Sequence, residues 1–332
     1  MVTSPNVQTG AGSSPPPRHP PAATPARGRM SISNLTAGKI ATTGRILLYG
    51  PEGIGKTLWP SKAPSPAYLC SESGTETYDL PRIPTPHTWD DVFDALRSLH
   101  DDTHDRKTLV VDTIDWLEPM CWSAVCEKAG KKDIEEFGYG KGYVAALDEW
   151  RRFLSELERL RRDRKMWIVL LAHSWIKPFK NPTGEDFDRY QLKLHEKASG
   201  LIKEWSDAVL FANFETFALK KDPKSKTERA KGSSSGARFV NTQRTAAWDA
   251  KNRYSLPEKM PLDWDDFAAA VAAGAPEDPA TLRVEIAEMV KDADPTLAAK
   301  VADAVTKAGE DAASLARIKD RLGAKLAQKD GQ

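Results

Sequence analysis

The sequence predicts an α/β protein that is built on a mainly parallel β-sheet. Polar and amphipathic segments separate four short apolar runs, at residues 46–49, 67–70, 108–112 and 167–172. Residues 89–99 carry apolar side chains on one helical face, and residues 115–128 and 143–162 are also expected to form helices. Strands that alternate with helices are joined by right-handed crossovers, which make the strands parallel. Such sheets bind their ligands at the carboxyl ends of the strands.

The alternation of strand-like and helix-like segments ends after residue 207. Two strand-like stretches, residues 208–219 and 237–248, flank a connection that is rich in lysine, serine and glycine. This pattern predicts a β-hairpin that extends the sheet, followed by a short closing helix at residues 264–273.

Composition divides the chain of 332 residues into three predicted parts. Residues 1–34 are rich in proline, serine, alanine, threonine and glycine, and cannot bury enough apolar surface to offset the entropy of ordering. We expect a disordered tail there; it lacks acidic residues, so it is either a solvated linker or a weak contact for a polyanion. Residues 35–274 form the expected core domain. Residues 275–332 show helical periodicity, which predicts a small helical module.

Charge and cysteine content narrow the class of protein. The chain has 48 lysine and arginine residues against 47 aspartate and glutamate residues, so any nucleic-acid site must be local. The odd count of 3 cysteines favours a reducing compartment, and Cys121 and Cys126 are expected to be buried thiols rather than metal ligands. No apolar run approaches the roughly 18 residues that span a bilayer, and no signal pattern begins the chain. The sequence therefore predicts a cytoplasmic protein without membrane contact.

A glycine-rich motif directly follows the first predicted strand. It fits the P-loop pattern G-x-x-x-x-G-K-[ST] and consists of Gly50, Pro51, Glu52, Gly53, Ile54, Gly55, Lys56 and Thr57. Backbone N–H groups of such a loop surround a β-phosphate, Lys56 can reach the β- and γ-phosphates, and the Thr57 hydroxyl can hold Mg²⁺. A helix that starts after the loop should add its dipole, although Pro60 and Pro64 should end that helix early. A glycine-rich turn that matches by chance is the alternative.

An acidic residue, Asp112, closes the third predicted strand. A carboxylate at this position could hold Mg²⁺ opposite Thr57, as the Walker B acid of P-loop proteins does. Asp115 is a competitor, but it falls beyond the strand end and is expected in the first turn of a helix. A solvated acid at a strand end is the alternative for Asp112. Together with the P-loop, this acid predicts Mg²⁺ and the phosphates of a nucleotide as ligands.

Two further polar residues follow predicted strands at the same sheet edge. We expect the second strand to lie beside the P-loop strand, where Glu72 could orient or deprotonate the water that attacks the γ-phosphate. Glu76, on the following loop, is a rival for that role. His173 follows the fourth strand, where it could sense the γ-phosphate or serve only as hydrogen-bonded scaffolding.

Two connections at this edge, residues 130–143 and 174–199, interleave cations with aromatic residues. Long loops inside a compact domain tend to be functional or disordered. Aromatic rings that stack on bases, beside cations that neutralise phosphates, suit single-stranded nucleic acid. The candidate DNA-binding residues are Lys131, Lys132, Tyr139, Lys141, Tyr143, Trp175, Lys177, Lys180 and Arg189. In the alternative, the aromatic residues pack the loops down and the charges are solvated.

Lys251 and Arg253 follow the second predicted hairpin strand. Cations at i and i+2 of an extended segment point the same way. They could complete a phosphate site on a neighbouring subunit, as an arginine finger does in trans, or they could form surface salt bridges.

With these parts placed, the core resembles a RecA-like ATPase, and more narrowly the phage-encoded RecA-like single-strand annealing proteins. The resemblance covers about residues 40–272. Its motifs are GPEGIGKT (50–57), the strand end at Ser71-Glu72, LVVDT (109–113), FGYGKGY (137–143), LLAHS (170–174) and AKNRYSLP (250–257). The resemblance implies ATP with Mg²⁺, assembly into a ring or filament, and single-stranded DNA binding through two central loops.

By that resemblance, Glu72 matches the water-activating acid, His173 matches the sensor, and Lys251 and Arg253 match the trans-acting cations. The family also implies promotion of strand annealing or pairing. The sequence therefore predicts a DNA-dependent ATPase of phage recombination or replication that works in the cytoplasm of a bacterial host. One alternative is a helicase-type motor or loader. Another is a nucleotide-switched adaptor that recruits a partner, such as a single-strand-binding protein, through residues 275–332.

Overall fold

The computed structural model describes residues 32, 35, 42–218, 232–274, 279–291, 293–309 and 311–330. The tail predicted at residues 1–34 lies outside them, apart from residue 32. The chain divides into two compact units, a larger one at Lys39–Glu285 and a smaller one that contains Ile286–Gln332. The domain boundaries predicted from composition remain predictions.

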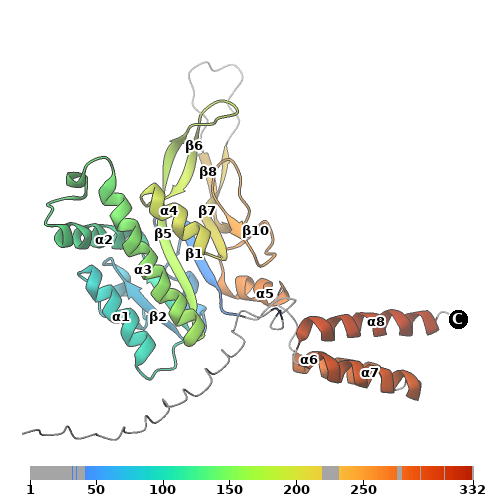
Figure 1. The fold of residues 1–332 in the computed structure, drawn as a ribbon. Coiled ribbons are helices and arrows are strands. Elements are labelled where there is room, and N and C mark those ends of the chain that lie inside the picture. The colour runs from blue at the N-terminus through green and yellow to red at the C-terminus, as the bar shows by residue number, and fades with distance from the viewer. Residues whose placement is uncertain are drawn as a thin grey trace, which may run out of the picture. The chain divides into compact units, whose positions relative to one another are not determined.

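One mixed sheet organises the larger unit (Figure 1). Its strands lie in the order β10 (Lys259–Pro261), β8 (Gly232–Asn241), β7 (Ala208–Ala218), β1 (Arg45–Gly50), β5 (Trp167–Phe179), β4 (Thr108–Asp112), β2 (Pro66–Cys70) and β3 (Arg82–Ile83). Neighbours from β7 to β3 are parallel, whereas β8 and the short β9 (Lys251–Asn252) pair with β7 in antiparallel fashion. The parallel core and the predicted hairpin of β7 and β8 are both present.

Alternating side chains of the parallel strands build two cores, one on each face of the sheet. Leu47 and Tyr49 of β1 pack in the cluster covered by α1 (Trp89–Asp101), α2 (Ile114–Ala129) and α3 (Lys141–Asp163). Ile46 and Leu48 pack on the opposite face, in the cluster that includes side chains of α5 (Trp264–Gly274). The strands are therefore buried on both sides, which explains their uninterrupted apolar runs.

The helix expected after the P-loop is reduced to η2 (Trp59–Lys62), one turn of 3₁₀ helix. Ala63, which precedes Pro64, is extended, as the ring of a following proline requires. The expectation of a helix dipole at the phosphate site is therefore wrong, because so short a turn has no appreciable macrodipole. Trp59 instead packs against Trp264 and Phe267 of α5, with ring centroids 4.8 and 5.1 Å away.

The second strand does not lie beside the P-loop strand. β2 pairs with β4 and β3, whereas β1 pairs with β5 and β7. The expectation was wrong because strands that are consecutive in sequence need not be neighbours in a sheet. All these parallel strands nevertheless end at the same edge, so β2 still delivers its last residues there.

The segment at residues 174–199 is not an irregular loop. β5 continues to Phe179 and pairs in antiparallel fashion with β6 (Phe187–Leu192), and α4 (Glu196–Trp205) follows. Trp175, Lys177 and Phe179 occupy every second position of β5, which is the spacing at which side chains of a strand lie on one face. In the other connection, Ile134–Phe137 forms a 3₁₀ turn, and α3 begins two residues before its predicted start.

The described residues after position 274 form three helices, namely α6 (Pro279–Met289), α7 (Pro295–Ala308) and α8 (Ala312–Asp330). Asp294 caps α7 by accepting hydrogen bonds from the backbone N–H groups of Thr296 and Leu297. Ile286, Leu315 and Leu322 are buried. Among the described residues, no helix has the length and apolar character needed to cross a bilayer.

Candidate nucleotide-binding site

The P-loop leaves β1 at Gly50 and turns at two glycines with positive φ, +71° at Gly53 and +103° at Gly55. Residues with a Cβ rarely adopt that backbone region. A Cβ on Gly50 would lie 2.4 Å from the carbonyl oxygen of Ala212 in β7, which is closer than such atoms can pack. The glycines are thus required both for the path of the loop and for the approach of β7.

Lys56 lies inside the loop, and only 6% of its surface is exposed. Its ammonium group donates to the carbonyl oxygens of Gly50 at 3.2 Å and Pro51 at 2.9 Å. Burial lowers the pKa of Lys56, although nearby carboxylates, Asp112 first, oppose that change. Because its hydrogen bonds go only to carbonyl groups in the described part of the chain, Lys56 can turn to a phosphate without breaking an ion pair.

A cavity of about 220 Å³ opens beside the loop. It brings together residues from four places in the sequence, namely the P-loop, the end of β2, the end of β4 and β5. The residues that line it are Gly53, Gly55, Lys56, Thr57, Leu58, Glu72, Ser73, Gly74, Thr75, Tyr78, Asp112 and His173. Predicted site residues from four places in the sequence therefore face one space.

Asp112 fits the predicted metal site. It is 1% exposed, and neither carboxylate oxygen has a hydrogen-bond partner of good geometry among the described residues. Burial raises the pKa of Asp112, while Thr57 and Lys56 oppose the rise. A buried carboxylate without partners is costly unless a cation compensates it. The carboxylate of Asp112 and the hydroxyl of Thr57 are the hard oxygen ligands that Mg²⁺ prefers.

Asp115, the competing acid, has a different position. Its two carboxylate oxygens accept hydrogen bonds from the backbone N–H and the Nδ1–H of His173, both at 2.9 Å. Burial alone would raise the pKa of Asp115, but the hydrogen bonds from His173 outweigh it and lower that pKa. Asp115 is not among the residues that line the cavity. It orients His173, and Asp112 is left as the metal candidate.

Glu72 lines the cavity and is half-buried, whereas Glu76 is exposed. Burial raises the pKa of Glu72, and His173 and Lys56 only partly oppose it. A carboxylate with a raised pKa accepts a proton from water more readily near neutral pH. The carboxylate of Glu76 instead accepts a hydrogen bond from the Gly74 N–H at 2.6 Å within its own loop. The placement favours Glu72, and its catalytic role stays a prediction.

His173 stands opposite Gly50 in the pairing of β5 with β1, so it is adjacent to the first residue of the P-loop. Its Nδ1 is held by Asp115. With Nδ1 protonated towards Asp115, Nε2 is the ring nitrogen left for a ligand in the cavity. This geometry suits a sensor whose ring cannot rotate freely.

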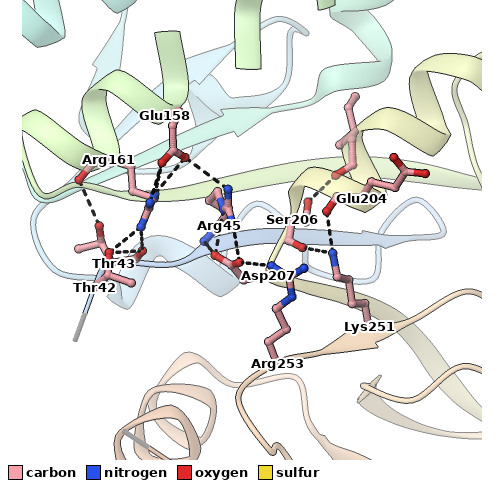
Figure 2. A network of polar contacts seen from close by, with 11 residues as sticks. Thr42, Thr43, Arg45, Glu158, Arg161, Glu204, Ser206, Asp207, Lys251 and Arg253 are labelled. Carbon is pink, nitrogen blue, oxygen red and sulfur yellow. Dashed lines mark hydrogen bonds and ion pairs between the residues drawn. The ribbon is translucent and has the colours of Figure 1, made fainter. Parts of the chain in front are cut away.

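Lys251 and Arg253 do not line the cavity and have partners in their own chain. Figure 2 shows Arg253 directed at Asp207, where its guanidinium donates at 3.1 Å. Lys251 caps the carboxyl end of α4 by donating to the carbonyl oxygens of Lys203, Glu204 and Ser206, at 3.2, 2.7 and 2.6 Å. A role in trans would require Lys251 to leave three acceptors. Arg253, with 55% of its side chain exposed, would give up one ion pair.

Most candidate DNA-binding residues are accessible on two elements. Tyr139 is fully exposed at a tip between Gly138 and Gly140. On the β5–β6 hairpin, the ammonium group of Lys177 lies 3.5 Å from the ring centroid of the half-buried Trp175. The other accessible cations are Lys131, which is half-buried, and Lys132, Lys141 and Lys180, which are exposed.

Two of the candidates are used inside the protein. Arg189 is buried, and its Nη2 donates to Asp249 and to the Thr245 carbonyl, which disfavours the predicted contact with DNA. Its ion pair satisfies the half-buried carboxylate of Asp249 instead. The hydroxyl of Tyr143 donates to Glu135, and its ring stacks on His195 at 4.1 Å. Tyr143 therefore helps to pack the 130–143 connection against the fold, which agrees with the alternative interpretation.

Sequence reasoning missed two residues near these elements. Arg238 of β8 donates to the carbonyl oxygen of Ile54, and a Cβ on Gly55 would lie 2.7 Å from its Nη1. It supports the outer side of the P-loop, but nothing in the sequence signals a contact across 184 positions. Glu118 of α2 is buried and accepts two hydrogen bonds from the His195 N–H. The sequence signal for Glu118 was the presence of an acid among the apolar residues of a predicted helix.

Comparison with known proteins identifies the family of the chain. No curated protein sequence matches the chain. Among solved structures, the crystal structure of the RadB recombinase matches at 16% sequence identity and a TM-score of 0.34, over 60% of this chain and 80% of that chain. The family described as an AAA domain matches residues 42–254. With the strand order of the sheet, this match confirms the predicted fold class, an α/β protein with a P-loop NTPase core. Since the match covers more than half of the chain, the protein belongs to the AAA domain family.

Proposed function

We propose that this protein hydrolyses ATP at the P-loop cavity. The observation that carries the proposal is the meeting of Lys56, the unpartnered carboxylate of Asp112 and the half-buried carboxylate of Glu72 around one space. Phosphoryl transfer needs little covalent help from the protein, because positioning and charge neutralisation supply most of the catalysis. These three residues have the charges and positions for those two tasks.

Each residue has a separate task in this proposal. Lys56 neutralises the β- and γ-phosphate oxygens after leaving its carbonyl partners. Thr57 and Asp112 would hold Mg²⁺, which would screen the charge of the phosphates. Glu72 orients the attacking water and accepts its proton. His173, fixed by Asp115, offers Nε2 to the γ-phosphate side of the cavity.

We further propose that single-stranded DNA binds the accessible aromatic and basic residues of the 130–143 connection and the β5–β6 hairpin. The hairpin continues directly from the strand that carries His173, so a movement at the nucleotide site would reach it through one continuous backbone. The resemblance to phage annealing proteins supports strand annealing as the outcome, with the chain acting as a homo-oligomeric ring or filament. Arg253 is then the better candidate for a contact in trans.

Turnover of ATP with and without single-stranded DNA tests the proposal. The wild type should turn over ATP faster with DNA, and should speed the annealing of complementary strands without unwinding a duplex. Lys56→Ala should lower turnover by roughly 100- to 1,000-fold, the usual loss of one group that stabilises transition-state charge. A folded wild-type protein without turnover under either condition would contradict ATP hydrolysis. Directional unwinding would indicate a helicase-type motor instead.

A second candidate function is a nucleotide-switched adaptor. The observation in its favour is that residues 286–332 belong to a compact unit distinct from the one that holds the P-loop. The expected partner of α6–α8 is a single-strand-binding protein. A chain cut after Gly274 should lose that partner in a pull-down and keep its ATPase activity, and retention of the partner would exclude the adaptor.

A further inference from the structure

One segment, residues 173–195, leaves the nucleotide site, forms the β5–β6 hairpin and returns to the body of the larger unit. Both of its ends are held by α2. Asp115 accepts the His173 N–H at 2.9 Å at the first end. At the second end, the two carboxylate oxygens of Glu118 accept the His195 N–H at 3.0 and 3.1 Å. Between these points the Lys193 N–H donates to the His173 carbonyl at 2.9 Å, which closes the base of the hairpin.

The two carboxylates are neighbours on one helical face, since positions i and i+3 lie one turn apart. α2 begins two residues after Asp112, the candidate metal ligand at the end of β4. A small displacement at the end of β4 would therefore move α2 as a rigid helix, and with it the carboxylates of Asp115 and Glu118. Asp115 additionally binds the ring of His173, so one of the two attachment points includes a side chain that lines the nucleotide cavity.

The second attachment point is built as firmly as the first. Glu118 is 6% exposed, and the His195 N–H offsets part of the cost of burying its carboxylate. His195 accepts the Lys197 N–H through its ring as the N-cap of α4. The same ring stacks on Tyr143 of α3 with an interplanar angle of 9°. Glu118 thus fixes the point at which the hairpin joins α3 and α4.

We propose that Asp115 and Glu118 form a two-point clamp through which the nucleotide site sets the position of the β5–β6 hairpin, with Glu118 as the positioning residue at its far end. The clamp itself concerns only the position of the hairpin. The identity of what the hairpin binds rests on the proposed function, which assigns single-stranded DNA to it.

The chemistry of Glu118 makes the clamp sensitive to pH. Burial raises the pKa of Glu118 to about 7, the His195 N–H opposes the rise, and Asp115 on the same helix adds to it. The titratable groups around it are Cys121 of α2, Tyr143 of α3 and the His195 ring, with His173 beyond Asp115. An ionised carboxylate is the stronger acceptor for a backbone N–H. The attachment of His195 should therefore tighten as the pH rises through 7.

Three variants test the clamp. Glu118→Ala removes the acceptor, Glu118→Gln keeps one acceptor oxygen and cannot ionise, and Glu149→Gln is the matched control. Glu149 is also a poorly exposed acid with structural partners, the Trp89 indole and Lys128, but its partners lie outside the hairpin segment. Two measurements are made on the full chain between pH 6 and 8. They are backbone hydrogen exchange of residues 174–192 with and without ATP, and ATP turnover with and without single-stranded DNA.

In the wild type, ATP should slow exchange in the hairpin, and stimulation by DNA should increase above pH 7. Glu118→Ala should lose the ATP-dependent protection and at least about fivefold of the DNA stimulation, a typical coupling between two sites. Its turnover without DNA should stay within about twofold of the wild type, since Glu118 does not line the nucleotide cavity. Glu118→Gln should keep the stimulation but lose its dependence on pH, and Glu149→Gln should behave as the wild type.

The inference is overturned if Glu118→Ala, or Glu118→Gln where the alanine variant does not fold, keeps both the wild-type protection and the wild-type pH profile. It is also overturned if Glu149→Gln loses coupling to the same extent, because the effect would then be a general loss of stability. Absence of turnover in the wild type contradicts the proposed function alone, since the exchange measurement still reports on the clamp. Absence of any ATP effect on exchange in the wild type contradicts the clamp.

Discussion

At the edge formed by β7 and β9, two acids are surrounded by cations, whereas at the P-loop cavity the acids have few partners. Asp207 bonds Arg45 and Arg253. Asp249 bonds Arg189, Lys203 and Arg244. Asp112 at the cavity has no hydrogen-bond partner of good geometry among the described residues, and the ammonium group of Lys56 beside it bonds only carbonyl groups.

The pKa values of the two regions shift in opposite directions. Burial alone would raise the pKa values of Asp207 and Asp249, but bonds from Arg45 and Lys203 respectively lower them. Burial prevails at Asp112 and Glu72, whose pKa values are raised. The edge therefore uses its charges to stabilise the fold, while the cavity keeps its charges for a ligand. Perturbed pKa values in a cavity are a common sign of function.

The largest expected effect comes from Glu72→Gln, which removes the proposed base without changing the shape of the cavity. Turnover of ATP should fall by roughly 100- to 10,000-fold, the usual contribution of a positioned acid–base group. Binding of ATP, measured by calorimetry, should change little, because the residue acts on the attacking water. Glu76→Gln is the matched control. A comparable loss of turnover in that variant would assign the role of the base to Glu76.

Replacing one acid from each region with asparagine separates the roles of the two regions. Asp112→Asn should abolish Mg²⁺-dependent turnover and leave the free energy of unfolding unchanged or higher, because a buried charge without partners is removed. Asp249→Asn should cost about 1–3 kcal/mol of unfolding free energy, because Arg189 is left buried without its carboxylate. ATP turnover by the Asp249→Asn variant should stay near the wild-type rate. Urea unfolding and ATPase assays check both, and the opposite pattern would contradict the comparison.

The acid dependence of stability sharpens the same contrast. Asp207 has a folded-state pKa below its ordinary value of 3.8, so its contribution is present above pH 3.8 and is lost as the pH falls through the folded value. Asp207→Asn should therefore show a shallower loss of stability in acid than the wild type. Glu118 has the opposite sign for global unfolding, which returns its carboxylate to water. Its contribution to the free energy of unfolding is present below its ordinary pKa of 4.5 and is lost as the pH rises through about 7, although its bond to the His195 N–H tightens over the same range. Urea titrations from pH 3 to 8 compare the two.

The smallest expected effect distinguishes accessible cations from paired ones. Lys177→Ala on the hairpin should weaken binding of single-stranded DNA a few-fold and reduce the slope of log affinity against log salt by about 0.7, the value for one lost phosphate contact. Arg189→Ala should instead lower the unfolding temperature, since its charge is neutralised by Asp249 inside the fold. Fluorescence anisotropy at several salt concentrations measures the first effect. A salt slope that is unchanged in Lys177→Ala would remove the hairpin from the DNA site.

The grouping of Lys56, Glu72, Asp112 and His173 could be predicted from the sequence because parallel strands end at a common edge. That rule was sufficient even though β2 lies far from β1 in the sheet. The catalytic and metal-binding roles of these residues remain predictions, because a cavity shows proximity and not turnover.

The partners of Arg189 and Lys251 could not be predicted in this way. Asp249 lies 60 positions from Arg189, and the α4 carbonyl groups lie 45 to 48 positions from Lys251. No local pattern distinguishes a cation with a distant partner from a cation that awaits a phosphate. The hairpin at residues 174–192 was missed for a different reason, since an alternation of aromatic and cationic residues is compatible with both an exposed strand and a binding loop.

The packing of Trp59 on α5 has a consequence for synthesis of the chain. The P-loop is made well before the wall behind it, which comes from Trp264 and Phe267, and Lys62 reaches Asp263 across 201 positions. A nascent chain therefore carries a complete phosphate motif long before that motif has support. Affinity for ATP should develop only when α5 has left the ribosome, so that nucleotide binding marks a finished domain.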